Sequence, residues 1–209
     1  MNDILSILTS VGAIVPNGHF VGTSGRHFDT YINKDNLSLH TQKISEVGKI
    51  FAEKYKDRDI DVVVAPAVGG IAFSQWVAHH LSELKGSEVL AIFTEKTADN
   101  GQVLKRGYDK IVEGKNCLVI EDLTTTGGSV KKVVETVQQA GGKVVEVCVM
   151  VNREPSHVTS ETIGVPFSQL AVLEIPSYDA NECPLCRSGV PVNTELGHGK
   201  KFLAEKENI

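Results

Sequence analysis

Short apolar segments that alternate with amphipathic ones are the feature that most restricts the fold of this chain. Residues 61–65 read Asp-Val-Val-Val-Ala, and the later apolar segments are equally short. Strands that are apolar on both faces are typical of parallel sheets covered by helices on both sides. We therefore predict an α/β fold with an open, mostly parallel sheet flanked by helices. The predicted strands are residues 61–65, 89–93, 117–120 and 144–151, and the predicted helices are 3–13, 41–55, 71–84 and 129–140.

The segments on either side of this alternating pattern have a different character. Residues 18–34 mix Gly with aromatic and β-branched residues, which predicts a hairpin-like flap around Ser24-Gly25. From residue 177 onward the pattern gives way to Pro, Gly and polar residues, as in a tail packed on a domain or on a partner. We expect one domain over residues 1–209, with an N-terminal helix and flap (1–40), an α/β core (41–175) and a C-terminal tail (176–209).

Charge and hydropathy exclude several classes of partner. The net charge is −5, and Lys and Arg are scattered along the chain instead of forming the basic stripe that nucleic-acid binding needs. No apolar run approaches the roughly 18 residues that span a bilayer, and the first residues lack a basic leader. We expect a cytoplasmic protein that binds neither nucleic acid nor a membrane.

The segment 117–129 predicts a binding site for a sugar phosphate. An apolar strand is followed by two acidic residues, then by a loop rich in Thr and Gly, then by a helix. Ligands of open parallel sheets bind beyond the carboxyl ends of the strands, and the N–H groups at a helix N-terminus attract anions. Hydroxyl groups add donors, and glycines allow close approach. The expected phosphate-binding residues are Leu123, Thr124, Thr125, Thr126, Gly127, Gly128 and Ser129.

The acidic pair suits a different part of the same ligand. Glu121 and Asp122 can accept hydrogen bonds from ribose hydroxyls or hold a hydrated Mg²⁺. The acidic pair and the phosphate loop together fit a ribose 5-phosphate. We expect Mg²⁺ as a cofactor that arrives with the substrate, near these carboxylates, and no ion held directly by the protein alone.

Residues 117–129 resemble the sequence motif of type I phosphoribosyltransferases, which bind phosphoribosyl pyrophosphate (PRPP). The segment lacks P-loop spacing and no Lys follows its glycines, which argues against an NTPase. The resemblance implies the fold of that family with an N-terminal flap or hood, transfer of ribose 5-phosphate from PRPP, and a homodimer.

Residues 18–31 look like the flap of orotate phosphoribosyltransferases, in which an aromatic side chain at the position of Tyr31 lies against the base. Asn152-Arg153 resembles an Asp-Arg pair whose Arg contacts the carboxylate of orotate, and Arg matches a carboxylate bidentately. The resemblance implies Tyr31, Thr125 and Arg153 as base-binding residues.

Two further segments resemble the pyrophosphate-binding parts of the family. Residues 94–108 match a mobile loop that closes on pyrophosphate, so Lys96, Lys105 and Arg106 are the expected catalytic cations. Residues 65–70 resemble a short loop that holds pyrophosphate, which adds Val68 and Gly69 to the PRPP-binding set.

Some positions depart from the better-known orotate enzymes. Thr23 and Gly69 stand where those enzymes carry Lys, and Glu95 stands where they carry Arg. The favoured acceptor is orotate, in pyrimidine nucleotide biosynthesis. A purine or another base in salvage, or a PRPP-binding protein without catalysis, stay open as alternatives.

The four cysteines fall into two kinds. Cys117 and Cys148 lie in apolar runs and are expected to be buried thiols. Cys183 and Cys186 have the spacing of two metal ligands, but a structural zinc site takes four. His198 is a possible third ligand that is distant in sequence, so we favour no metal or redox role for this pair.

Overall fold

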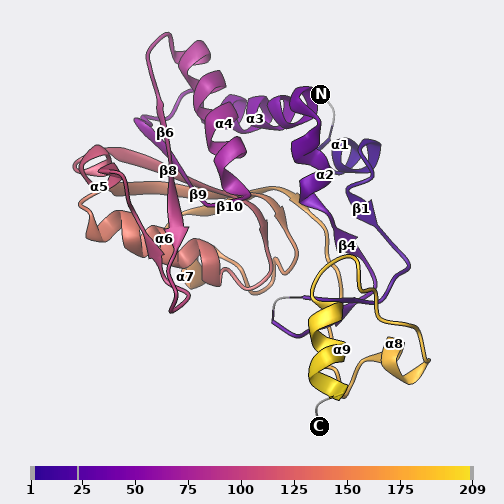
Figure 1. Cartoon of the computed structure of the whole chain (residues 1–209). Helices are drawn as coiled ribbons and strands as arrows, with labels where there is room; N and C mark the ends of the chain where they lie inside the picture. Colours follow the sequence, from indigo (N-terminus) through magenta and orange to yellow (C-terminus); the bar gives the residue numbers. More distant parts are fainter. Residues whose placement is uncertain (1–2, 23, 208–209) are drawn as a thin grey trace. The chain divides into compact units, whose positions relative to one another are not determined.

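The computed structural model describes residues 3–22 and 24–207 (Figure 1). Thr23, one of the departures noted above, lies outside them. The chain forms two compact units, one built mainly from residues 38–173 and the other from residues 5–37 together with 174–207. The single domain expected over residues 1–209 stays a prediction. None of the described helices combines the length and apolar character that a membrane-spanning helix requires.

A six-stranded sheet forms the centre of the first unit. Its strand order is β10-β9-β8-β5-β6-β7, and all neighbours are parallel except β7, which runs antiparallel to β6. The strands are β5 (Val62–Pro66), β6 (Leu90–Lys96), β7 (Gln102–Val103), β8 (Asn116–Thr124), β9 (Lys143–Asn152) and β10 (Phe167–Val172). The predicted α/β class with a mostly parallel sheet is confirmed.

Strand β8 is longer than the apolar run that predicted it. It continues past Ile120 because Glu121, Leu123 and Thr124 still pair with β9. The acidic pair is therefore part of the strand and does not belong to the loop that follows. Pairing with β9 therefore fixes the backbone conformation of Glu121 and Asp122, which would be less restricted in a loop.

Helices cover both faces of this sheet. Helix α6 (Gly128–Gln139) lies on one face, and α3 (Thr41–Tyr55) and α4 (Gly70–Lys85) lie on the other (Figure 1). Side chains along a strand alternate between the two faces, so Val62, Val64 and Val119 pack with the valines of α6 in one buried cluster. The short helices α5 (Tyr108–Val112) and α7 (Ser160–Ile163) complete the unit.

Tyr55 ties helix α3 to the sheet through a buried polar contact. Its hydroxyl donates to Glu146 Oε1 at 2.6 Å and lies 3.0 Å from Ser168 Oγ. Burial, with the carboxylate of Glu146 nearby, raises the pKa of Tyr55 well above its usual range. The phenol therefore stays protonated and remains a donor at any physiological pH.

The second unit joins an N-terminal pair of hairpins to the C-terminal segment. Strands β1 (Ile14–Val15) and β4 (Tyr31–Ile32) pair antiparallel, as do β2 (Phe20–Val21) and β3 (His27–Phe28). The helices of these segments are α1 (Ile4–Ser10), α2 (Lys34–Leu39), α8 (Pro184–Arg187) and α9 (Gly199–Glu207). The predicted first helix, 3–13, ends earlier because Gly12 adopts a φ of 64°.

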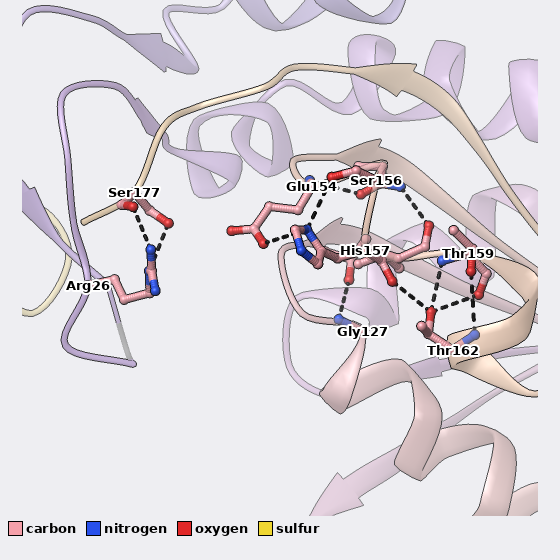
Figure 2. Close-up of polar contacts among 11 residues, drawn as sticks. Arg26, Gly127, Glu154, Ser156, His157, Thr159, Thr162 and Ser177 are labelled. Carbon is pink, nitrogen blue, oxygen red and sulfur yellow. Dashed lines mark hydrogen bonds and ion pairs between the residues drawn. The ribbon is translucent and has the colours of Figure 1, made fainter. Parts of the chain in front are cut away.

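The C-terminal segment is bound to the flap along its length. His27 and Tyr178 exchange backbone hydrogen bonds of 2.8 and 2.9 Å, and the Asn193 N–H donates to the His19 carbonyl at 2.8 Å. Arg26 donates to Ser177 from two nitrogens, at 2.9 Å to Oγ and 2.5 Å to the carbonyl (Figure 2). The tail and the flap therefore form one structure.

Candidate active site

The carboxyl ends of four parallel strands, β5, β6, β8 and β9, lie at one edge of the sheet. The segments that follow them are residues 67–69, 97–101, 125–127 and 153–159. Three of these segments contain expected substrate-binding residues, and the remaining residues of the predicted cradle lie at the end of β8 and the start of α6. The sheet thus brings together, within the first unit, side chains that are far apart in the sequence.

The turn between β8 and α6 forms the predicted phosphate cradle. The Gly127 N–H donates to Thr124 Oγ1 at 3.1 Å, and Gly127 adopts a φ of 73° just before the helix. The N-cap residue of α6, Gly127, has no side chain to accept from the first turn, and the Gly128 N–H donates to Thr126 Oγ1 at 3.4 Å. The N–H groups at the start of this 12-residue helix point out of the helix end, where they and the helix dipole favour an anion.

A short helix that the sequence did not reveal supports this turn from behind. A Cβ on Gly127 would lie 2.7 Å from Ile163 Cδ1 and 3.4 Å from Val158 Cγ1. Ile163 is held by a capping box, in which Thr159 N donates to Thr162 Oγ1 at 2.9 Å and Thr162 N donates to Thr159 Oγ1 at 3.5 Å (Figure 2). The cradle is thus fixed by packing as well as by its own hydrogen bonds.

The acidic pair lies directly before the cradle and is buried. Glu121 is 7% exposed and Asp122 is 2% exposed. The Leu123 N–H donates to Asp122 Oδ1 at 2.6 Å, and the Asp122 N–H donates to Glu121 Oε1 at 3.3 Å. Carboxylate oxygens are the ligands that Mg²⁺ prefers, so the chemistry of this donor set fits a magnesium ion as well as a ribose diol.

The predicted mobile loop is a hairpin made of the end of β6 and β7. Lys105 Nζ lies 3.1 Å from Glu95 Oε2, and Arg106 forms an ion pair with the same carboxylate. The Arg106 guanidinium also stacks over the Phe93 ring at 5.3 Å, while Lys96 is exposed at the end of β6. Two of the three expected catalytic cations are therefore paired with Glu95. From the sequence, Glu95 was notable only as a residue that replaces an Arg of the better-known orotate enzymes.

Helix α6 holds this hairpin in place. Lys132 Nζ donates to the Asn100 carbonyl at 2.6 Å, and Thr136 Oγ1 donates to the Gln102 carbonyl at 3.2 Å. Both contacts involve exposed or partly exposed groups, so each adds little to stability. Leu104, directly after β7, also packs against the buried cluster that contains the valines of α6.

The loop between β5 and α4 has the second set of pyrophosphate-binding candidates. Val68 is 84% exposed, and Gly69 is the N-cap of α4. At Gly70 a Cβ would lie 2.7 Å from the Ala65 Cβ, so a side chain there would push α4 away from β5. The Ala67–Val68 peptide bond is cis.

The base-binding candidates belong to different units. The Arg153 N–H donates to the Thr124 carbonyl at 2.9 Å. The backbone of Arg153 therefore lies next to the cradle, of which Thr125 is a part. Tyr31 lies in the second unit, where its ring stacks with Phe28 at 6.3 Å between centroids and contacts the tilted ring of Phe20 at 5.4 Å.

The side chain of Asn152, the residue before Arg153, holds the shape of the loop that follows β9. It is fully buried, its Nδ2 donates to the Val158 carbonyl at 3.2 Å, and its Oδ1 accepts from the Glu154 N–H at 3.1 Å. The side chain shapes the loop that carries Arg153. The uncharged amide suits this task because it both donates and accepts.

The fold and the cradle define a class of enzyme that binds a sugar phosphate at the end of a parallel sheet. A family model, the phosphoribosyl transferase domain, matches residues 34–163. The class is therefore that of the phosphoribosyltransferases.

Known relatives narrow this class. The chain is 38% identical over 179 residues to an orotate phosphoribosyltransferase of Caldanaerobacter subterraneus, covering 86% of this chain and 88% of that relative. It also resembles the crystal structure of Mycobacterium tuberculosis orotate phosphoribosyltransferase, with a TM-score of 0.65, 26% identity, and coverage of 82% and 97% of the two chains. A structure of the same enzyme in complex with PRPP matches with a TM-score of 0.55, 26% identity, and coverage of 68% and 80%. This chain belongs to the orotate phosphoribosyltransferase family.

Proposed function

We propose that this protein transfers the 5-phosphoribosyl group of PRPP to orotate, giving orotidine 5'-phosphate and pyrophosphate in pyrimidine nucleotide biosynthesis. The observation that carries the proposal is the cradle at Thr124–Ser129, with a buried acidic pair directly before it. The match to the orotate phosphoribosyltransferase of Caldanaerobacter subterraneus covers 88% of the length of that relative. The protein is an enzyme of the pentosyltransferase type.

In this proposal the residues work mainly by positioning and by charge. The first-turn N–H groups of α6 and the hydroxyls of Thr125, Thr126 and Ser129 bind the 5-phosphate. Glu121 and Asp122 accept hydrogen bonds from the ribose hydroxyls and stabilise the positive charge that develops on the sugar as pyrophosphate leaves. Magnesium, when bound with PRPP near these carboxylates, neutralises charge on the leaving group.

The pyrophosphate contacts require a change in the hairpin. Lys105 and Arg106 are paired with Glu95, so we propose that they exchange this carboxylate for the pyrophosphate when PRPP binds. Lys96, Val68 and Gly69 complete the pyrophosphate site. Glu95 then acts as a competitor for the two cations in the free enzyme.

This exchange predicts the effect of replacing Glu95 by glutamine. Lys105 and Arg106 are more than half exposed, and such an ion pair is worth about 0.2–1 kcal/mol. Glu95→Gln is therefore expected to lower the KM for PRPP by about 1.4- to fivefold. Steady-state kinetics at constant ionic strength measures the change, with the exposed Glu113→Gln as a control. An unchanged or higher KM for PRPP would contradict the exchange.

Arg153, Thr125 and Tyr31 are proposed to bind the base. Arg153 is suited to pair with the carboxylate of orotate, which purines lack. The test is pyrophosphate release from PRPP and Mg²⁺ with orotate, hypoxanthine or guanine as the acceptor. Turnover of a purine but not of orotate would replace the proposal by purine salvage. Calorimetric binding of PRPP without turnover of any base would indicate a protein that binds PRPP without catalysis.

The assembly, the cofactor and the location belong to the same proposal. We propose a Mg²⁺-dependent homodimer in the cytoplasm, as the family resemblance implies. Omission of Mg²⁺ from the assay should abolish turnover, and sedimentation equilibrium should give twice the mass of the chain. A monomer with full activity would exclude the dimer as a requirement.

A further inference from the structure

Two histidines of the flap and two cysteines of the tail meet inside the second unit. His19 directly precedes β2 and His27 lies on β3, whereas Cys183 is the N-cap of α8 and Cys186 lies within it. The potential ligand atoms, one from each residue, all lie within 4.8 Å of one another. His19 is 2% exposed, and His27 and Cys183 are fully buried.

The distances between these atoms approach those of a tetrahedral zinc site. Cys183 Sγ and Cys186 Sγ each lie 3.7 Å from His19 Nε2, and Cys186 Sγ lies 3.5 Å from His27 Nδ1. With Zn–S bonds of about 2.3 Å and Zn–N bonds of about 2.0–2.1 Å, tetrahedral S and N ligands are about 3.6 Å apart. His19 Nε2 and His27 Nδ1 are 2.7 Å apart. A bound ion places two imidazole nitrogens about 3.3 Å apart, so these rings must separate by about 0.6 Å.

The surroundings orient His19 as a ligand. Its Nδ1 donates to the Val190 carbonyl at 2.7 Å, which places the proton on Nδ1 and leaves the Nε2 lone pair facing the two sulfur atoms. Metal-binding histidines commonly donate their second N–H to a carbonyl or a carboxylate in this way.

The backbone around His27 is equally fixed. Both its N–H and its carbonyl are bonded to Tyr178, and the edge of its ring meets the Phe202 ring with centroids 4.6 Å apart. Its Nδ1 faces the cluster, while Nε2 is buried and makes no hydrogen bond within the described residues. Both imidazoles thus present one nitrogen to the same point.

We propose that His19, His27, Cys183 and Cys186 bind a structural Zn²⁺ that fastens the tail to the flap. Thiolate and imidazole ligands in a tetrahedral arrangement select zinc. Two thiolates balance the two charges of the ion in this buried position, and the two thiol protons leave to solvent on binding. Four protein ligands leave no position for water or substrate, so the site is structural and takes no part in catalysis.

The sequence alone had shown only half of this site. Cys183 and Cys186 have recognisable ligand spacing, but their partners lie more than 150 residues earlier in the chain. His198, considered as a third ligand, is not among the four residues of the cluster. The available signal was the presence of His19 and His27 in the same flap segment as Tyr31, the residue expected to contact the base.

Metal analysis of the full-length protein, purified anaerobically without chelator, tests the proposal. Inductively coupled plasma mass spectrometry should find about one zinc per chain. Cys183→Ser and His27→Asn should each lower this to below about 0.1 per chain after gel filtration. Cys148→Ser, at another buried cysteine, and His157→Asn, at an exposed histidine, should retain the zinc.

A second measurement on the unaltered sequence covers the case in which a ligand variant fails to fold. After removal of zinc with a chelator, titration with Co²⁺ should give the sulfur-to-cobalt charge-transfer bands and the intense visible bands of tetrahedral cobalt. Addition of Zn²⁺ should then erase them. The absence of these bands, together with less than about 0.1 zinc per chain after incubation with excess Zn²⁺, would overturn the proposal. An intact mass that shows a Cys183–Cys186 disulfide in the anaerobic protein would overturn it as well.

Discussion

Asp122→Asn is expected to reduce kcat/KM for PRPP by about a hundredfold, or about 2.7 kcal/mol of transition-state stabilisation. The substitution keeps the size of the side chain and the oxygen that accepts from the Leu123 N–H. It removes the negative charge, which we propose acts on the ribosyl centre as pyrophosphate leaves. Because the carboxylate is 2% exposed, water screens this charge only weakly.

Steady-state kinetics with varied PRPP and saturating orotate measures this effect. Asp109→Asn, which alters an exposed carboxylate in the first turn of α5, is the matched control and should leave kcat/KM unchanged. The thermal midpoint of Asp122→Asn should stay close to that of the unaltered protein. A reduction of less than about threefold would show that the charge of Asp122 does not act in the transition state.

Gly127→Ala should cost both stability and PRPP affinity. The φ of 73° disfavours any residue with a Cβ, and the new methyl group would lie 2.7 Å from Ile163 Cδ1. Strain of this kind costs about 1–3 kcal/mol, and relief of the clash moves the turn that carries the phosphate donors. We expect at least about a tenfold weaker binding of PRPP, since the displacement of one charge-assisted hydrogen bond is worth about 1.5–3 kcal/mol.

Gly164→Ala provides the matched control. Gly164 adopts a φ of 87°, but a Cβ there meets no atom within 4 Å. This variant therefore carries the backbone strain without the clash, and PRPP affinity by calorimetry should be retained. Adding Ile163→Val to Gly127→Ala removes the clashing Cδ1 and should restore part of the affinity. Equal PRPP affinities for Gly127→Ala and Gly164→Ala would contradict the role assigned to Ile163.

The elements of the fold and of the candidate site that could be predicted from the sequence are those specified by residues close together in the chain. The strands of the sheet core are continuous apolar runs, and the cradle follows from a strand, a Thr- and Gly-rich turn and a helix within thirteen consecutive positions. Local patterns of this kind specify backbone geometry directly. The α/β class and the family followed from them, whereas the roles of the individual site residues stay predictions.

The parts that could not be predicted depend on contacts between distant residues. Ile163 closes the space behind Gly127 from a separate helix, and no local pattern marks that contact. Lys105 and Arg106 read as free cations because their pairing with Glu95 requires the hairpin to form first. Nor does any spacing rule connect His19 and His27 with two cysteines near the other end of the chain.

The division of the second unit between two distant segments has a consequence for the order of folding. Residues 5–37 leave the ribosome early, but the partners of His19 and His27 are made only after the whole sheet. Chains are synthesised at about 5–20 residues per second, so the flap segment waits roughly 7–30 s for its counterpart. Phe20, Phe28 and Tyr31 contact one another within the flap segment itself, so this aromatic group can form before the tail is made. The backbone hydrogen bonds between flap and tail, by contrast, form only at the end of synthesis.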